Sequence, residues 1–323
     1  MYFYQSQSTD PYFNIATEEY FLKNFADDFF YLYINRPSVI VGKHQNTMAE
    51  INVPYVMENN IPVIRRLSGG GTVFHDSGNL NFCFIQKGKP GYLVDFKKFS
   101  QPIFDLLQKL EVNAWLHGKS DLVINNLKFS GNAEHVYKNK VLHHGTLLFS
   151  SELNQLNEVL KADWDKFTDK AVRSNRSKVT NISQHLKNPL TIDDFSQMIA
   201  TQVKEQHPEI KDFVMQPSDT TTINELVTNK YSTWEWNFSY SPAYEFIRTV
   251  ELPEGLLKVN FEVDKGVIQN MHFEYAGNRI PIIEEGLIGE RHDFLLLKKK
   301  LGLLFAQQTT IGFSKDELMT ILF

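Results

Sequence analysis

Apolar residues recur along the first half of the chain with the spacing of short strands and of two helices. Asp10-Pro11 is typical of a helix start, and the residues that follow predict a helix that ends near Phe25. Around residues 99–110, apolar positions recur at steps of three and four, which predicts a second helix. Runs of β-branched and aromatic residues predict strands at 29–34, 38–41, 63–66, 72–75, 79–86, 122–124, 127–129, 136–142 and 146–149.

The second half of the chain is predicted to hold more helix and a second unit. From Leu153 onward the sequence becomes helical and rich in lysine, and Thr191 begins a capped helix. A hairpin is expected at residues 256–263 and 267–275, and helices at 292–305 and 315–323. The order of elements predicts an α+β fold, with a mixed-sheet domain at residues 1–244 and a small α+β C-terminal domain at residues 245–323.

Composition and charge narrow the class of protein. The 323 residues correspond to about two domains, and the 42% of hydrophobic residues suffice for a core. The net charge of −5 provides no basic field for a nucleic acid, so we expect no nucleic-acid partner. A single cysteine, Cys83, excludes a disulfide framework within the chain. Without a secretory signal or a run of 18 apolar residues, the expected location is cytoplasmic, with no membrane contact.

Three consecutive glycines between two predicted strands form the first candidate binding element. The segment Arg65-Arg66-Leu67-Ser68-Gly69-Gly70-Gly71-Thr72 places two of the eight arginines directly before the glycines. Glycine allows positive φ angles and a close approach of ligands to backbone N–H groups, and arginine pairs with phosphate or carboxylate oxygens. The alternative is a flexible glycine hairpin with surface arginines.

Two further segments carry candidate chemistry. Lys128 lies on a predicted strand before a Ser-Gly bend, where it is either a point charge for an anionic intermediate or an exposed strand lysine. Residues 166–178 are locally basic and either close over a nucleotide phosphate, meet an acidic partner, or form a solvated surface. The histidines lack the helical spacing of a zinc site, and the segment 118–120 lacks the first glycine and the following helix of a P-loop.

Together these motifs resemble the signature of the lipoate–protein ligases, over almost the whole chain. The segments that carry the resemblance are residues 10–19, 35–46, 65–82, 128–133, 143–148, 170–181 and 234–242. It implies the mixed-sheet catalytic fold of the biotin and lipoate ligases and the use of ATP and Mg²⁺. Lipoate and ATP would give lipoyl-AMP and pyrophosphate, and a lysine of an acceptor domain would then displace AMP.

The resemblance also implies roles for individual residues. Lys128 is the implied catalytic residue, and Asp121 the implied ligand of Mg²⁺. The implied ATP and adenylate contacts are Arg66, Gly70, Gly71, Thr72, Val73, Phe74, Lys128, Lys170, Arg173 and Arg176. The implied lipoate contacts are Tyr33, Ser68, Gly69, His75, Lys128, His144 and Gly145. Expected partners are apo lipoyl domains of 2-oxoacid dehydrogenase acyltransferase subunits or the glycine-cleavage H protein, and a monomer is expected because no exposed heptad seam is present.

Three other functions stay open at this point: an octanoyl- or lipoyl-transferase, a biotin ligase, and a non-catalytic protein that binds lipoate or lipoyl domains. A transferase that forms an acyl-enzyme needs a cysteine nucleophile, but Cys83 lies between Phe82 and Phe84 in a predicted core strand. Biotin ligases are expected to carry a different glycine-rich motif. A non-catalytic binding protein could dispense with Lys128 or the glycines, and both are present.

Overall fold

The chain folds into two compact units, each assembled from several segments. This computed structural model describes residues 1–88, 94–161, 163–253, 255–307 and 312–323. The first unit contains residues 1–43, 62–156 and 174–232, and the second contains residues 44–61, 157–173 and 233–323. Each unit contains segments from distant parts of the sequence. The boundary between residues 244 and 245 stays a prediction.

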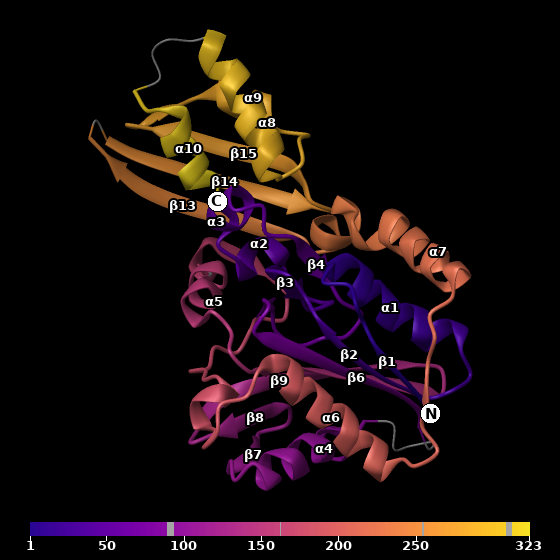
Figure 1. The fold of residues 1–323 in the computed structure, drawn as a ribbon. Coiled ribbons are helices and arrows are strands. Elements are labelled where there is room, and N and C mark those ends of the chain that lie inside the picture. Colours follow the sequence, from indigo (N-terminus) through magenta and orange to yellow (C-terminus); the bar gives the residue numbers. More distant parts are fainter. Residues whose placement is uncertain (89–93, 162, 254, 308–311) are drawn as a thin grey trace. The chain divides into compact units, whose positions relative to one another are not determined.

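An eight-stranded mixed sheet forms the centre of the first unit (Figure 1). Its order is β12-β1-β2-β6-β10-β9-β8-β7, with β1 parallel to both neighbours and the other pairs antiparallel. The strands are β1 (Tyr2–Gln5), β2 (Phe29–Ile34), β6 (Asn79–Lys87), β7 (Ala114–His117), β8 (Asp121–Ile124), β9 (Leu127–Tyr137), β10 (Lys140–Leu148) and β12 (Lys211–Asp212). The α+β class with a mixed sheet is therefore confirmed.

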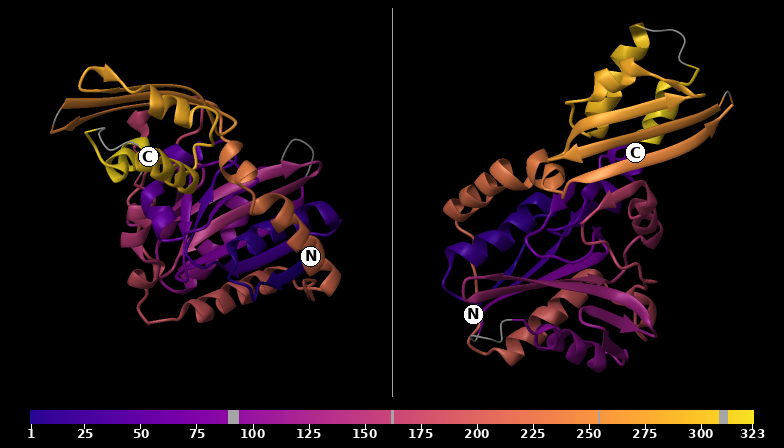
Figure 2. Two further views of the ribbon diagram at one scale, coloured as in Figure 1. Left: turned by 90° about the horizontal axis from the view of Figure 1, so that it is seen from above. Right: turned by 180° about the vertical axis from the view of Figure 1, so that it is seen from behind.

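Helices cover the two faces of this sheet differently (Figures 1 and 2). On one face lie α4 (Phe96–Lys109) and α6 (Ile192–Gln206), where Phe82 and Phe84 join the buried core. Helix α1 (Pro11–Asn24) lies against the other face. Because neighbouring residues of a strand point to opposite sides, Cys83 and His144 face α1 rather than this core.

A three-stranded sheet in the same unit carries the glycine motif. Its order is β4-β3-β5, built from β3 (Ser38–Val41), β4 (Val63–Arg65) and β5 (Val73–His75). Residues 66–72, the glycine loop, connect β4 to β5. The unit is completed by η2 (Ile182–His185), α7 (Pro217–Leu226) and the π-helical turn η3 (Val227–Tyr231). Helix α5 (Leu153–Val159) begins in the first unit and ends in the second.

The second unit is built on a five-stranded sheet with the order β11-β13-β14-β15-β16. Its strands are β11 (Phe167–Asp169), β13 (Tyr244–Leu252), β14 (Gly255–Asp264), β15 (Val267–Tyr275) and β16 (Asn278–Arg279). Its helical segments are α2 (Thr47–Glu50), α3 (Val53–Glu58), η1 (Trp164–Lys166), η4 (Glu235–Ser239), α8 (Pro281–Leu287), α9 (Phe294–Gln307) and α10 (Lys315–Leu322).

Most local predictions are confirmed where turn or cap chemistry is explicit. Asn125 and Asn126 form the turn of a hairpin with φ angles of 51° and 63°. Thr191 and Ser314 both cap helices through reciprocal capping boxes. The prediction of one strand over residues 136–142 is wrong, because the chain turns at Lys138, whose φ is 54°, and the segment is divided between β9 and β10.

Candidate active site

A buried arginine holds the glycine loop from within. The Arg66 guanidinium donates to the backbone oxygens of Gly69 (2.6 Å), Gly71 (2.8 Å) and Ile40 (3.1 Å). Its Nε donates to Ser68 Oγ at 2.9 Å. These contacts fix the path of the loop, so Arg66 supports the backbone that was predicted to bind phosphate.

The two arginines before the loop are interior side chains. Arg65 is fully buried and donates to the backbone oxygens of Gly42 and Lys43, at 2.9 and 3.1 Å. Burial lowers the pKa of Arg66 to about 10, although the negative charge of Glu18 opposes the shift, so Arg66 stays charged at neutral pH. A flexible hairpin with surface arginines is therefore not what the structure contains.

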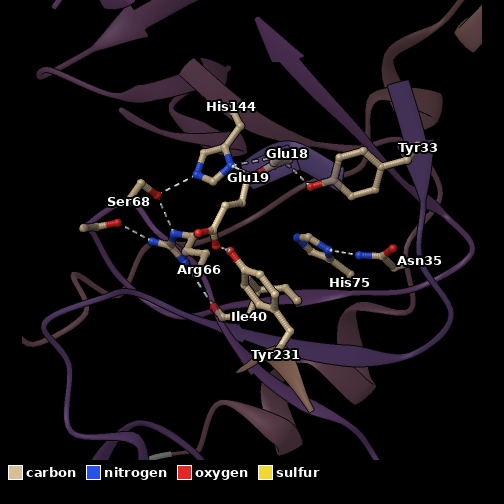
Figure 3. Close-up of polar contacts among 11 residues, drawn as sticks. Glu18, Glu19, Tyr33, Asn35, Ile40, Arg66, Ser68, His75, His144 and Tyr231 are labelled. Carbon is tan, nitrogen blue, oxygen red and sulfur yellow. Dashed lines mark hydrogen bonds and ion pairs between the residues drawn. The ribbon is translucent and has the colours of Figure 1, made fainter. Parts of the chain in front are cut away.

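Glu18 on α1 ties three predicted lipoate contacts together (Figure 3). Its carboxylate accepts from Tyr33 Oη at 2.9 Å and from His144 Nδ1 at 2.8 Å. His144 Nε2 lies 2.6 Å from Ser68 Oγ, which also accepts from Arg66. A carboxylate only accepts, so the proton of a neutral His144 is on Nδ1 and Ser68 donates to Nε2. The network links α1, β2, β10 and the glycine loop.

His75 lies at the end of β5 with one ring nitrogen engaged. Asn35 Nδ2 is 3.0 Å from His75 Nδ1, whereas Nε2 has no hydrogen-bond partner among the described residues. Burial, with a smaller contribution from the charge of Arg66, lowers the pKa of His75 to about 3. The imidazole is therefore neutral at physiological pH.

A second buried carboxylate, Glu19, anchors the end of the first unit to α1. It accepts hydrogen bonds from Lys23 and Lys230, both at 2.6 Å, and from the hydroxyl of Tyr231. Burial alone would raise the pKa of Glu19, but these hydrogen bonds outweigh it and hold the pKa below its ordinary value. The π-helical turn η3 is thereby fixed to the helix that also carries Glu18.

A β-bulge aims Lys128 at Asp121. In a regular strand, Lys128 and Gly131 would face opposite sides, but the pairing of β8 with β9 shifts between Leu122 and Val123. Lys128 Nζ consequently lies 2.9 Å from Asp121 Oδ1, and a Cβ on Gly131 would lie 3.3 Å from that nitrogen. Both charged side chains are about one-fifth exposed, at 22% and 19%. The ammonium group of Lys128 is thus partly accessible to solvent and positioned by Asp121, unlike that of a free surface lysine.

The second half of the basic segment forms hydrogen bonds with the glycine loop and with the strand of Lys128. Ser174 Oγ accepts from the Thr72 N–H at 2.9 Å, so that amide of the predicted phosphate loop is already engaged. The Lys128 N–H donates to the Lys178 oxygen, and the Thr180 N–H donates to the Lys128 oxygen, both at 2.9 Å. Residues 174–180 therefore run from the glycine loop to the strand of Lys128.

The predicted ATP contacts are divided between the two units. Arg176 is exposed on the first unit, whereas Lys170 and Arg173 belong to the second unit. Arg173 donates to the Phe167 oxygen at 3.2 Å within that unit. Of the predicted lipoate contacts, Gly145 faces away from the Glu18 network, since a Cβ there would lie 2.2 Å from Asn132 Oδ1.

Cys83 is fully buried, and burial raises the pKa of its thiol well above the ordinary value, with the negative charge of Glu18 adding to the effect. A thiol in that state is a poor nucleophile for a transferase. In the part of the chain that the structure describes, no group of three or more His, Cys, Asp or Glu side chains is placed to hold a metal ion.

Glu18, Asn35 and Ser174 are site residues that the assignment of roles missed. A sequence signal existed for Glu18, because the Glu18-Glu19 pair lies within the helix Pro11–Asn24, between apolar positions. Buried carboxylates need partners, so a Glu-Glu pair inside an apolar helix indicates a polar network. Asn35 and Ser174 carry no comparable signal, since their partners lie 40 and 102 positions away.

A family model, the lipoyl protein ligase A/B catalytic domain, matches residues 10–204. These residues include the glycine loop, Lys128 and the basic segment. The chain belongs to this family. It is 39% identical over 301 residues to lipoate–protein ligase 1 of Staphylococcus aureus, covering 91% of each chain. The sequence-based family assignment is therefore confirmed.

Solved structures confirm the fold of this lipoate ligase family member. Over 99% of this chain and 98% of the other, it resembles P. falciparum LipL1 in complex with lipoate, with a TM-score of 0.62 and 21% identity. A lipoate–protein ligase A bound with ATP matches 73% of this chain and 97% of its own, with a TM-score of 0.60 and 23% identity. Within the described residues, no helix is both long and apolar enough to cross a bilayer.

Proposed function

We propose that this lipoate–protein ligase works through two reactions at Lys128. In the first, a carboxylate oxygen of lipoate attacks the α-phosphorus of ATP and pyrophosphate leaves. In the second, the amine of an acceptor lysine attacks the acyl carbon, loses a proton, and AMP leaves with the oxygen it shared with that carbon. The observation that supports this most directly is the partly exposed Lys128–Asp121 pair, in which the backbone of Lys128 is hydrogen-bonded to Lys178 and Thr180.

Lys128 is the group that we assign to charge neutralisation. The first step brings a carboxylate and a triphosphate together, so a cation must offset their repulsion. Asp121 holds Lys128 Nζ in place before substrates bind, and incoming anions compete for the same ammonium group. In the second step the same charge stabilises the oxyanion that develops on the acyl oxygen when the amine attacks the acyl carbon.

The remaining sequence assignments become proposals with modified roles. Arg66 acts by holding the loop whose backbone, apart from the engaged Thr72 N–H, approaches the phosphates, rather than by reaching a phosphate itself. Arg176, Lys170 and Arg173 supply positive charge to the nucleotide. Tyr33, Ser68, Gly69, His75, His144 and Gly145 are assigned to the lipoate site.

The donor set is compatible with Mg²⁺ at Asp121. Mg²⁺ takes oxygen ligands and is commonly held by one or two carboxylates together with substrate phosphates and waters, so a cluster of three side chains is not required. Asp121 is partly exposed and would be the protein ligand. When bound, the ion neutralises phosphate charge, while Lys128 keeps its own role.

Partner, domain and cellular assignments are proposed from the same activity. The acceptors are apo lipoyl domains of 2-oxoacid dehydrogenase acyltransferase subunits or the H protein of glycine cleavage. Residues 1–244 hold the ligand chemistry, residues 245–323 are accessory, and the enzyme is a cytoplasmic monomer. Octanoate is expected as a second substrate, because one methylene contributes only about 1–3 kcal/mol of discrimination in an apolar tunnel.

The test is the mass of an apo lipoyl domain after incubation with this protein, Mg²⁺, ATP and lipoate. We expect a lipoyl-sized gain only when ATP is present. Replacing Lys128 with alanine should reduce pyrophosphate release by at least about a hundredfold, because one removed transition-state donor costs that much in other enzymes. Lys119→Ala is the matched control, since Lys119 is exposed on the turn before β8. Unchanged release from Lys128→Ala would disprove the role of Lys128.

A further inference from the structure

The network behind His75 fixes which of its nitrogens carries the proton. Asn14 Nδ2 lies 2.8 Å from the Ser8 oxygen and 3.4 Å from the Ile34 oxygen. Carbonyl oxygens only accept, so the amide nitrogen of Asn14 must point toward them. The same nitrogen lies 2.8 Å from an Asn35 side-chain atom, which must therefore be the Asn35 oxygen.

The other end of Asn14 is compatible with this orientation, because both hydroxyls can donate to the amide oxygen. Its Oδ1 lies 2.9 Å from the Tyr31 hydroxyl and 2.7 Å from the Ser6 hydroxyl. Asn14 and Asn35 are both fully buried, so neither amide has solvent as an alternative partner. A flipped Asn14 would bring its oxygen against two carbonyl oxygens, and burial makes that arrangement costly.

The orientation of Asn35 then determines the state of His75. With its oxygen toward Asn14, Asn35 presents Nδ2 to His75 Nδ1 at 3.0 Å. An amide nitrogen donates, so Nδ1 accepts and the proton of the neutral ring must be on Nε2. His75 is only 3% exposed, and its Nε2 has no acceptor among the described residues.

Figure 3 shows the direction of this donor. The ring nitrogen of His75 that is turned away from Asn35 points to the side where Arg66, His144 and Tyr231 are drawn. A buried N–H without an acceptor is unfavourable in the free protein, and an acceptor on a ligand removes that cost. The fixed tautomer is therefore a preformed donor beside the glycine loop.

We propose that Asn14 and Asn35 are positioning residues that keep the His75 proton on Nε2, and that this N–H donates to an acceptor atom of the bound lipoyl substrate. The proposal rests on the proposed function, which supplies the substrate. The chain of contacts begins at backbone oxygens outside the site, so the donor is set before any ligand arrives.

The first measurement determines the His75 tautomer directly in the unsubstituted protein. Proton–nitrogen correlation spectra of the ¹⁵N-histidine-labelled protein, with His75 assigned by comparison with His75→Phe, distinguish a neutral ring protonated at Nε2 from one protonated at Nδ1. We expect protonation at Nε2. A His75 ring protonated at Nδ1 overturns the proposal, whatever the ligase activity.

A double-mutant cycle tests whether Asn35 acts through His75. We expect His75→Phe and Asn35→Ala each to weaken lipoate binding by about tenfold or more, measured by calorimetry, with ATP affinity unchanged. In the His75→Phe background, Asn35→Ala should change lipoate affinity by less than about twofold. An equal loss in both backgrounds would mean a purely structural role and would overturn the proposal.

Two comparisons keep the result distinct from a failure of the proposed function. If the wild-type protein binds no lipoate, the proposed function fails, whereas normal wild-type binding with unaffected variants contradicts only this inference. Octanoate lacks the dithiolane ring. Equal losses for octanoate and lipoate support the proposal with a carboxyl oxygen as acceptor, and a loss confined to lipoate supports it with a ring sulfur.

Discussion

Charged side chains beside the glycine loop are buried only with partners. Glu18 and Glu19 are adjacent on α1, yet they serve different parts of the structure. Glu18 accepts hydrogen bonds from Tyr33 and His144. Glu19 accepts hydrogen bonds from Lys230 and Tyr231, at the end of the first unit. A buried ion that loses its partner typically costs several kcal/mol, so each contact helps to hold the site in a single arrangement.

A buried histidine in the second unit makes stability depend on pH. His292 contacts the Tyr244 hydroxyl through Nδ1 (2.6 Å) and the Leu322 oxygen through Nε2 (3.0 Å). Burial lowers its pKa to about 4. Between about pH 6.5 and pH 4 the unfolded state binds the extra proton, so the free energy of unfolding should fall by about 3 kcal/mol as pH falls. Urea unfolding of wild type and His292→Gln should show a flatter profile for the variant.

The exposed His117 provides the control for this experiment. His117→Gln should follow the wild-type pH profile, because it leaves His292 and its contacts with Tyr244 and Leu322 in place. Parallel profiles for wild type and His292→Gln would show that His292 does not couple folding to protons.

Individual residues could be predicted from the sequence where a motif carries them, and not where long-range pairing does. Lys128, Ser68 and His144 stand in recognisable sequence segments. Ser68 lies in the glycine loop and contacts His144 on β10, and Lys128 lies on β9 and contacts Asp121. The engagement of Arg66 with its own loop was not predictable, because it depends on how residues 66–72 curl back onto the guanidinium. Spacing in sequence does not report that curvature.

At the scale of elements, local signals were sufficient for turns and caps but not for sheet order. The hairpin at Asn125-Asn126 follows from two residues that tolerate positive φ. The bulge that aims Lys128 at Asp121 depends on register between β8 and β9, and register is a property of the pair rather than of either strand. Helix α7 was missed because few apolar residues mark its buried side.

The contact between the glycine loop and the basic segment can be tested at Gly71. A Cβ at Gly71 would lie 3.0 Å from Ser174 Oγ and 3.2 Å from its Cα, so Gly71→Ala should push residues 174–178 away from the loop. We expect faster tryptic cleavage after Arg176 and Lys178 and a severalfold lower rate of lipoyl transfer, since the adenylate would be less shielded from water.

Gly302→Ala is the matched control, because its position is helical and a Cβ there meets no described atom within 4 Å beyond the nearby backbone of its own helix. Alanine there should leave cleavage and transfer at wild-type levels. If Gly71→Ala cleaves and transfers like Gly302→Ala, the packing of Ser174 on the loop has no role in closing the site.

At the scale of the whole molecule, the units interleave in sequence, so a linear boundary divides one of them. Strand β11 comes from the middle of the chain but pairs with β13, in the register Phe167↔Phe246. The Phe167 ring lies 5.2 Å from that of Phe246, and Phe167 is 6% exposed. Hydrophobic patterns identify strands, but they do not reveal that residues 167–169 belong to a sheet formed about 80 positions later.

A fragment of residues 1–244 would therefore separate β11 from its sheet. We expect amide hydrogen exchange to accelerate in residues 44–61 and 157–173, which belong to the second unit, and to stay unchanged in the eight-stranded sheet of the first. Local opening exposes Phe167, so the fragment should also aggregate more readily. Adding residues 245–323 as a separate chain should restore protection at 167–169 if that pairing alone was lost. Exchange at 167–169 equal to that of the full chain would instead show that residues 1–244 form a complete domain.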